Sequence, residues 1–231
     1  GRVGMATLSD LRNAVSGILA VPGVPAVLKL NSNTRERAFE AYVFSLVVQA
    51  VRQAGGNAEL HGVNTGLNPN PIVFRGAPGY MGSTAQDFCF GRCTLNNFEF
   101  EIHVDVIYVG SSGATHEVDV SVYDKAAADT VRQSPGMQPG TRSLRAAIEC
   151  KCYDSNLGTA LGRAFVGLVS DCGQLKAKDF VTNGQSQGLA RYFSKSSGPR
   201  SYFGVSPIVA NNANRFVHNV EQALRQWAGV T

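Results

Sequence analysis

The first quarter of the chain has apolar residues at the spacing of two helices. Residues 8–19 are typical of a short helix that precedes a proline-broken loop. Residues 34–54 predict a longer helix, which Asn33-Thr34-Arg35-Glu36 begins in the form of a capping box and Gly55-Gly56 ends. The apolar positions of this helix recur every three or four residues: Phe39, Tyr42, Val43, Leu46, Val47, Ala50 and Val51. We therefore expect one buried face on it.

The next part of the chain changes to the pattern of strands. Residues 98–109 and 116–122 alternate apolar and polar side chains, and the segment Gly110-Ser111-Ser112-Gly113 between them is typical of a turn. Together they predict an antiparallel hairpin. Residues 57–97, which are rich in Asn, Pro and Gly, predict a loop-rich insertion with one or two short strands.

The remainder alternates between the two patterns. Residues 124–143 predict a polar loop. Small residues, including Gly167, predict close packing of the helix at 159–169. The order of elements predicts an α/β fold: a three-layer core with a mixed central sheet flanked by helices. The further strands are expected at 144–153, 178–182 and 202–205, and the further helices at 159–169, 186–193 and 212–227.

Composition narrows the class of protein. The chain has 231 residues, 44% hydrophobic and 16% charged, against about 25% charged in an average domain. This excludes a disordered protein or a coiled coil, and it favours one domain over residues 6–231. Residues 1–5 are interpreted as a cloning remnant and a start methionine. The net charge of +4 permits a polyanionic partner without requiring one.

Other features of the sequence bear on the compartment. Five cysteines in a chain of this length predict buried, reduced thiols in a cytoplasmic protein. No stretch near the start is long enough to span a membrane, so we expect no membrane association.

Two of the predicted strands carry acids where strands usually avoid them. Residues two apart on a strand share a face, so Glu117 and Asp119 lie together, opposite Val118, Val120 and Val122. On the following strand Glu149 and Lys151 share a face, opposite the apolar side. Carboxylates at short range bind a hard divalent cation such as Mg²⁺, for which Mn²⁺ is expected to substitute. A lysine beside the ion can orient or deprotonate water.

This pattern resembles a known superfamily. Asp119, followed 30 residues later by Glu149-Cys150-Lys151, is similar to the motif of the PD-(D/E)xK nucleases, with Val118 in place of the motif's proline. The predicted order of elements resembles their restriction-endonuclease-like core. Phe39-Glu40-Ala41-Tyr42-Val43 resembles the acid-bearing first helix of the family, and Val181-Thr182-Asn183-Gly184 is similar to a segment of Mrr-type restriction enzymes. The resemblance covers residues 34–54 and 98–207.

The resemblance implies a role for each matching residue. Asp119 and Glu149 would bind the metal, and Lys151 would orient or activate the attacking water. Glu40 would ligate the metal directly or support its ligands. Glu36 is a rival for that role, although its position in the capping box explains it without function. Glu117 would either join the metal ligands or form a salt bridge with Lys151.

The function implied is that of a Mg²⁺-dependent DNA endonuclease in restriction, phage defence or repair. DNA is the expected partner, with Arg142, Arg145, Lys176 and Lys178 as candidate phosphate contacts. Many members of the superfamily are homodimers, and a separate targeting or motor protein would be a further partner. The sequence fixes neither.

Three alternatives differ from this function. An RNA nuclease would use the same site chemistry. A non-catalytic nucleic-acid-binding module on the same fold would leave the acidic set without a purpose. A glycoside hydrolase with paired carboxylates is disfavoured, because the chain has one Trp and Lys151 would have no role.

Overall fold

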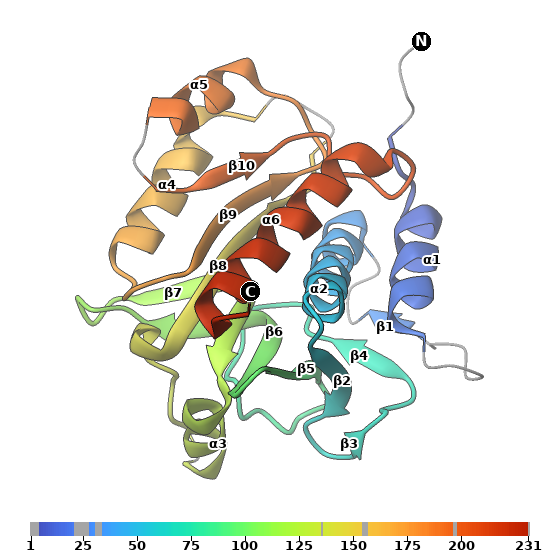
Figure 1. The fold of residues 1–231 in the computed structure, drawn as a ribbon, viewed down its shortest axis with the longest axis vertical. Helices are drawn as coiled ribbons and strands as arrows, with labels where there is room; N and C mark the ends of the chain where they lie inside the picture. The colour runs from blue at the N-terminus through green and yellow to red at the C-terminus, as the bar shows by residue number, and fades with distance from the viewer. Residues whose placement is uncertain are drawn as a thin grey trace.

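An eight-stranded mixed sheet forms the centre of the molecule (Figure 1). The computed structural model describes residues 5–20, 28–30, 34–134, 136–153, 157–195 and 198–230. The strand order is β10-β9-β8-β7-β6-β5-β2-β3, in which β8, β9 and β10 are parallel and the other neighbours antiparallel. The strands are β2 (Asn57–Gly62), β3 (Gly66–Leu67), β5 (Cys89–Leu95), β6 (Phe98–Val109), β7 (Thr115–Asp124), β8 (Leu144–Lys151), β9 (Ala177–Thr182) and β10 (Arg200–Tyr202).

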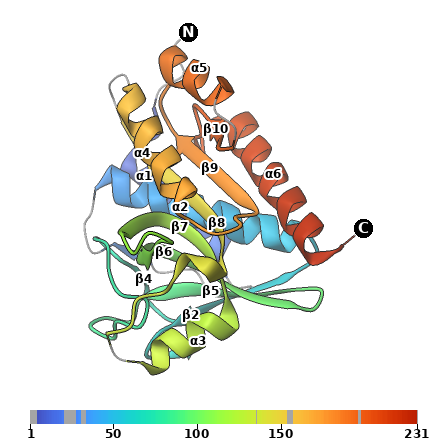
Figure 2. The same cartoon turned by 90° about the vertical axis from the view of Figure 1, so that its left-hand side faces the viewer.

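Helices cover both faces of this sheet. One face carries α1 (Leu8–Leu19), α2 (Arg35–Gln53) and α6 (Ala210–Ala228), and the other carries α3 (Lys125–Gln133), α4 (Thr159–Ser170) and α5 (Gln187–Lys195). Figure 2 shows α4 and α6 on opposite sides of β8 and β9. Each face has its own apolar core. The predicted α/β fold with a mixed central sheet flanked by helices is therefore confirmed.

Helix α2 is buried far more completely than its sequence pattern predicts. Every residue from Ala38 to Val48 is buried, because α2 lies between the sheet on one side and α1 and α6 on the other. The expectation of a single buried face is wrong for this helix. A helix enclosed on several sides fixes its side chains firmly, and Glu40 is one of them.

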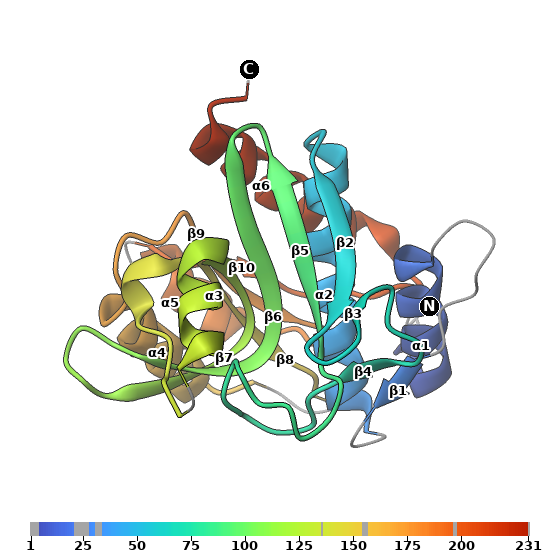
Figure 3. The ribbon, with the colours of Figure 1, turned by 90° about the horizontal axis from the view of Figure 1, so that it is seen from below.

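The segment 57–97 contains four strands, so the prediction of one or two short strands there is wrong. It contributes β2, β3 and β5 to the central sheet, and Figure 3 shows β2, β5 and β6 side by side. Its remaining strand, β4 (Ile72–Phe74), pairs in parallel with β1 (Leu28–Leu30) in a separate two-stranded sheet. The strand β2 was hidden in the sequence because β5, with which it forms most of its ladder, is distant in the chain. The strand β5 also forms a hairpin with the adjacent β6, which was not predicted from the sequence.

The expected polar loop at 124–143 contains helix α3. Lys125 and Asp129 form an i,i+4 ion pair at 2.5 Å, which supports a short helix. Ala128 and Val131 pack against the sheet.

The last strand lies earlier in the chain than the predicted 202–205. β10 ends at Tyr202, because its ladder with β9 fixes its register and Gly204 then adopts a positive φ of 64°.

The five cysteines are free and buried, as the sequence predicts. The interpretation of residues 1–4 as a cloning remnant lies outside the described residues. Within the described ranges, no helix has both the length and the apolar character needed to cross a bilayer.

The close packing of α4 occurs at Gly162, not at Gly167 as expected. A Cβ atom at Gly162 would lie 2.6 Å from Leu189 Cδ1 and 2.9 Å from the Tyr192 ring, both on α5. A Cβ atom at Gly167 would meet nothing within 4 Å.

We expect Gly162→Ala to lower the free energy of unfolding by about 1–3 kcal/mol, because the added methyl forces α5 away from α4. Gly167→Ala is the matched control and should raise the free energy of unfolding by about 0.4–1 kcal/mol. Urea denaturation of both variants measures the difference. Equal effects of the two substitutions would contradict this account of α4.

Candidate active site

The candidate site lies where β7 and β8 separate. Their ladder runs from Tyr123 and Leu144 to Val120 and Ile148, and it ends there. One residue further, the Oδ2 atom of Asp119 accepts the backbone N–H of Cys150 at 2.7 Å. The carboxylate thus takes the place of a ladder carbonyl. This bond holds Asp119 against the segment that carries Glu149 and Lys151, as the predicted adjacency of the two strands requires.

Three buried carboxylates meet at this point. Oxygen atoms of Glu40, Asp105 and Asp119 all lie within 4.8 Å of one another. Asp105 is fully buried, and its Oδ1 atom has no hydrogen-bond partner among the described residues. A buried carboxylate oxygen without a partner is rare, since its desolvation is not compensated. The group supplies only oxygen ligands, which hard cations prefer.

Asp105 was missed as a site residue in the sequence. It faces Asp119 between two paired positions of the β6–β7 ladder, Val104 with Val120 and Val106 with Val118. Its φ of 52° is unusual for a non-glycine residue and marks an irregularity in the strand. The hairpin loop is residues 110–114, which places residue 105 opposite residue 119, whereas the expected turn at 110–113 would place it opposite residue 118.

Because of the same irregularity, the residues of β7 do not face the sides of the sheet that the sequence predicts. Val120 and Val122 belong to the core beneath α2 and α6, but Val118 belongs to the core beneath α4. The three valines therefore do not share one face. The strict alternation of β7 changes at Asp119, where the neighbouring strand departs from regular geometry.

Arg37 joins two of the acids, a contact that the sequence did not indicate. Its Nη1 atom donates to Oε1 and Oε2 of Glu40 at 3.1 and 2.8 Å, and to Oδ2 of Asp105 at 2.9 Å. The predicted capping box is wrong by one residue: the hydroxyl of Thr34 caps α2 by accepting the Arg37 backbone N–H at 3.3 Å. Glu36 is exposed in the first turn, so Glu40 is the acid that reaches the site.

Lys151 links Asp119 with Glu149. Its Nζ atom lies 2.6 Å from Glu149 Oε1 and 3.3 Å from Asp119 Oδ2. Burial alone would lower the pKa of Lys151, but the charges of Asp119 and Glu149 raise that pKa above its usual value. The side chain is therefore a cation. Glu149 stands beside the three-carboxylate group rather than within it.

Glu117 occupies the margin of the site. It is exposed, near the start of β7. Partial desolvation and the charge of Asp119 raise the pKa of its carboxyl group. The structure thus brings Glu117 into the field of the site, but not into the group of three carboxylates within 4.8 Å.

Crowding of acids shifts the protonation of the buried group. Burial, then repulsion from Asp105 and Asp119, raises the pKa of Glu40 to about 9. Burial raises the pKa of Asp105 to about 7; Arg37 opposes that rise, and Asp119 adds to it. Burial and Asp119 raise the pKa of Glu149 to about 7. A site with these pKa values attracts positive charge.

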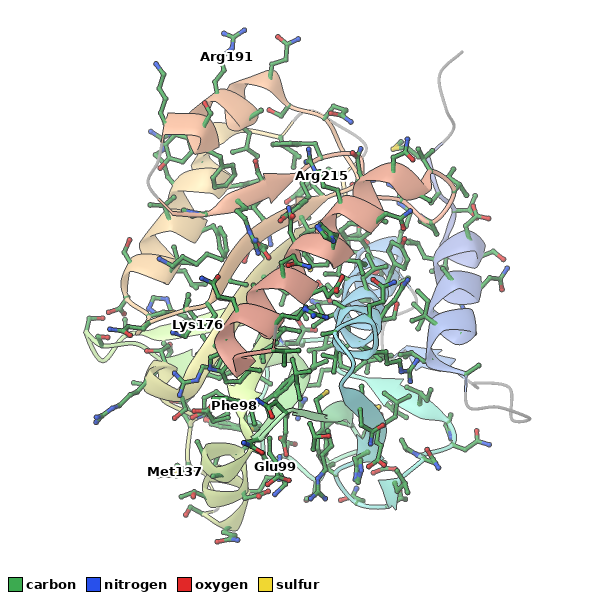
Figure 4. The ribbon with its side chains drawn as sticks, viewed as in Figure 1. Phe98, Glu99, Met137, Lys176, Arg191 and Arg215 are labelled. Carbon is green, nitrogen blue, oxygen red and sulfur yellow. The ribbon has the colours of Figure 1, made fainter. Side chains whose placement is uncertain are left out.

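Of the four candidate phosphate contacts, Arg142, Arg145 and Lys176 lie near the start of β8, whereas the acids lie near its end. Arg145 is near the start of β8, so about 20 Å of strand separates it from Lys151 at about 3.3 Å per residue. It forms an ion pair with Asp124. Lys176 lies by the end of α6 (Figure 4). Arg142 lines a pocket with Arg145, and Lys178 pairs with Ala147 in mid-strand. Their contact with DNA stays a prediction.

In comparisons with known proteins, no family model, curated protein or solved structure matches this chain.

The raised pKa values predict how stability depends on pH. Glu40, Asp105 and Glu149 hold protons more tightly when folded than in the unfolded chain, where their pKa is about 4. The unfolded state therefore binds fewer protons, and stability falls as pH rises from about 4 to about 9. In EDTA, we expect the free energy of unfolding to fall by more than about 1 kcal/mol between about pH 5 and pH 8.

Glu40→Gln should flatten this fall, since it removes the acid with the highest pKa in the group. Glu99→Gln, at an exposed position on β6, should leave the fall unchanged (Figure 4). Chemical denaturation at several pH values measures both. A stability that increases over this range in the wild-type protein would contradict the prediction.

Proposed function

We propose that this chain is a divalent-metal-dependent endonuclease of the PD-(D/E)xK type that hydrolyses phosphodiester bonds in DNA. One observation carries the proposal: Asp119 lies against Glu149 and Lys151 where β7 and β8 separate, with Glu40 reaching the same point from α2. These are the four catalytic positions that the sequence resemblance implies. Each comes from the element on which the resemblance places it.

The donors suit a hard divalent ion. Glu40, Asp105 and Asp119 would hold it, because their oxygens are mutually close and one Asp105 oxygen lacks a partner among the described residues. Glu149 stands near enough to interact electrostatically with Asp119. When bound, Mg²⁺ or Mn²⁺ supplies a Lewis acid that stabilises negative charge on the scissile phosphate and lowers the pKa of water. Asp105 is an addition to the ligands implied by the resemblance.

Lys151 acts as a donor rather than a base in this arrangement. Its ammonium group lies between Asp119 and Glu149, whose charges keep it protonated. A protonated lysine beside the phosphate orients the attacking water and stabilises the negative charge that develops on the phosphorus oxygens. Glu149 fixes the direction of the Lys151 side chain through the 2.6 Å ion pair.

Arg37 balances the acids until a metal ion arrives. Its guanidinium contacts Glu40 and Asp105, two of the proposed ligands. A divalent ion would compete with Arg37 for these oxygens, and the displaced guanidinium would be free to donate to a phosphate. The proposed site therefore contains a resident cation that metal binding must displace.

The decisive experiment is cleavage of supercoiled plasmid with Mg²⁺, Mn²⁺ or EDTA. We expect metal-dependent nicking that falls at least about 100-fold in Lys151→Ala, which removes a donor to the reacting phosphate, and in Glu149→Ala, which removes the carboxylate that directs Lys151. The matched controls are Lys195→Ala, at the exposed end of α5, and Glu99→Ala. Both should nick like wild type.

Single-stranded and duplex RNA form the second arm of this assay. Cleavage of RNA but not of DNA would transfer the proposal to an RNA nuclease. Failure to cut either polymer, together with tight binding of both in EDTA, would support a non-catalytic binding module and overturn the proposal.

Metal affinity tests the ligand set without relying on cleavage. Asp105→Asn should weaken Mn²⁺ binding at least about tenfold, because it removes a charged ligand. Arg37→Gln should tighten Mn²⁺ binding about tenfold, or about 1.4 kcal/mol, because it removes the competing cation. Calorimetry measures both, with Arg215→Gln on the exposed side of α6 as the control (Figure 4). Unchanged affinity in Asp105→Asn would remove Asp105 from the site.

A further inference from the structure

A pocket lies beside the candidate active site in the segment between β4 and β5. Its volume is about 340 Å³, within the size range of small-molecule sites. Its lining includes Arg75, Pro78, Gly79, Ser83, Ala85 and Phe88. Apolar walls with a single cationic side chain favour a ligand that has both a flat apolar part and a negative charge.

The pocket wall touches β6 at Asp105. The Gly79 backbone N–H donates to the Asp105 carbonyl at 3.0 Å, and the Gly79 carbonyl accepts from Ile107 N–H at 3.1 Å. The segment thus runs alongside the strand that supplies one of the buried acids. A ligand in this pocket would be a near neighbour of the proposed metal ion.

Arg75 is a buried cation that lies in the field of Asp105 but forms no ion pair with a described residue. It is 5% exposed. Its Nη atoms donate to three backbone carbonyls, of Val104, Tyr80 and Met81, at 3.2–3.4 Å, and its guanidinium lies 4.6 Å from the centre of the Phe88 ring. Burial lowers the pKa of Arg75 to about 10, so it remains charged at neutral pH.

One nitrogen donor of Arg75 has no acceptor among the described residues. This donor is the Nε atom, which is buried. A Cβ atom added at Gly79 would lie 3.6 Å from this Nε, so residue 79 adjoins the donor and has no side chain to cover it. Tyr80, in the same segment, is half exposed. A charged donor that is fixed, buried and unpartnered indicates an anionic acceptor.

We propose that this pocket binds a nucleotide, whose phosphate accepts from Arg75 Nε and whose base packs against Pro78 and Ala85. Its place beside Asp105 assigns it to a nucleotide of the substrate strand, next to the scissile phosphate. That source rests on the proposed function, whereas the binding itself does not. The exposed ring of Tyr80 offers a surface on which a neighbouring base can stack.

The test is calorimetric binding in EDTA, so that metal and cleavage play no part. The probes are the four deoxynucleoside monophosphates, the corresponding deoxynucleosides and inorganic phosphate. We expect at least one monophosphate to bind at least about tenfold more tightly than its nucleoside or phosphate alone, since both parts of the ligand contribute. A short single-stranded oligonucleotide should displace it.

Two variants act on the pocket in different ways. Gly79→Ala covers Nε without changing charge, and its φ lies outside the left-handed region. Arg75→Lys keeps the charge but removes the Nε donor. Each should weaken the monophosphate at least about tenfold. The controls are Gly140→Ala, where an added Cβ meets nothing within 4 Å, and Arg92→Lys at an exposed position on β5.

Several results would overturn the inference: no monophosphate binding, equal binding of nucleoside and monophosphate, equal binding of inorganic phosphate, or unchanged affinity in both variants. A monophosphate that the oligonucleotide does not displace would overturn its assignment to the substrate strand and leave a free nucleotide as the ligand. Cleavage is measured separately. Its absence would overturn the proposed function while the binding result stands.

Discussion

The hydrogen bond between the Cys150 amide and the Asp119 carboxylate sets the geometry of the candidate site. The β7–β8 ladder stops at Val120 and Ile148, and this bond keeps the two strands together as they part. The bond also gives the Cys150 backbone donor a partner beyond the end of the ladder. The Lys151 ammonium group lies 3.3 Å from the same Asp119 oxygen. A polar group would be costly here without such a partner, because both faces of the sheet are covered by helices.

Charge balance is the second constraint on this region. Glu40, Asp105 and Asp119 are buried in a chain that has few charged residues. Arg37 and Lys151 offset part of the repulsion, and protonation offsets more of it, as the raised pKa values of Glu40 and Asp105 indicate. The folded chain thus concentrates repulsion in one place. Such a local loss of folding stability is common where residues are arranged for binding or chemistry.

The surroundings give this region more than one way to hold an anion. Arg37 lies on the α2 side of the acids, and Arg75 lies in the pocket whose wall touches Asp105 through Gly79. Arg142 and Lys176 lie at the other end of the sheet, beside separate pockets. The basic residues are therefore spread over the length of β8. A long polyanion could contact several of them at once, whereas a small ligand could contact only one group.

The local sequence determined those helices and strands whose own apolar residues recur with a regular period. The hairpin of β6 and β7 and the helices α2, α4 and α6 follow from their own periodicity, and the motif of Asp119, Glu149 and Lys151 follows from residues on adjacent strands. Only the tertiary structure decided the rest. β2 is a strand because β5, distant in the chain, completes its hydrogen bonds. Arg37 and Asp105 belong to the site because the packing of α2 on an irregular strand brings them together. Long-range pairing and backbone irregularity leave little trace in the periodicity of a sequence.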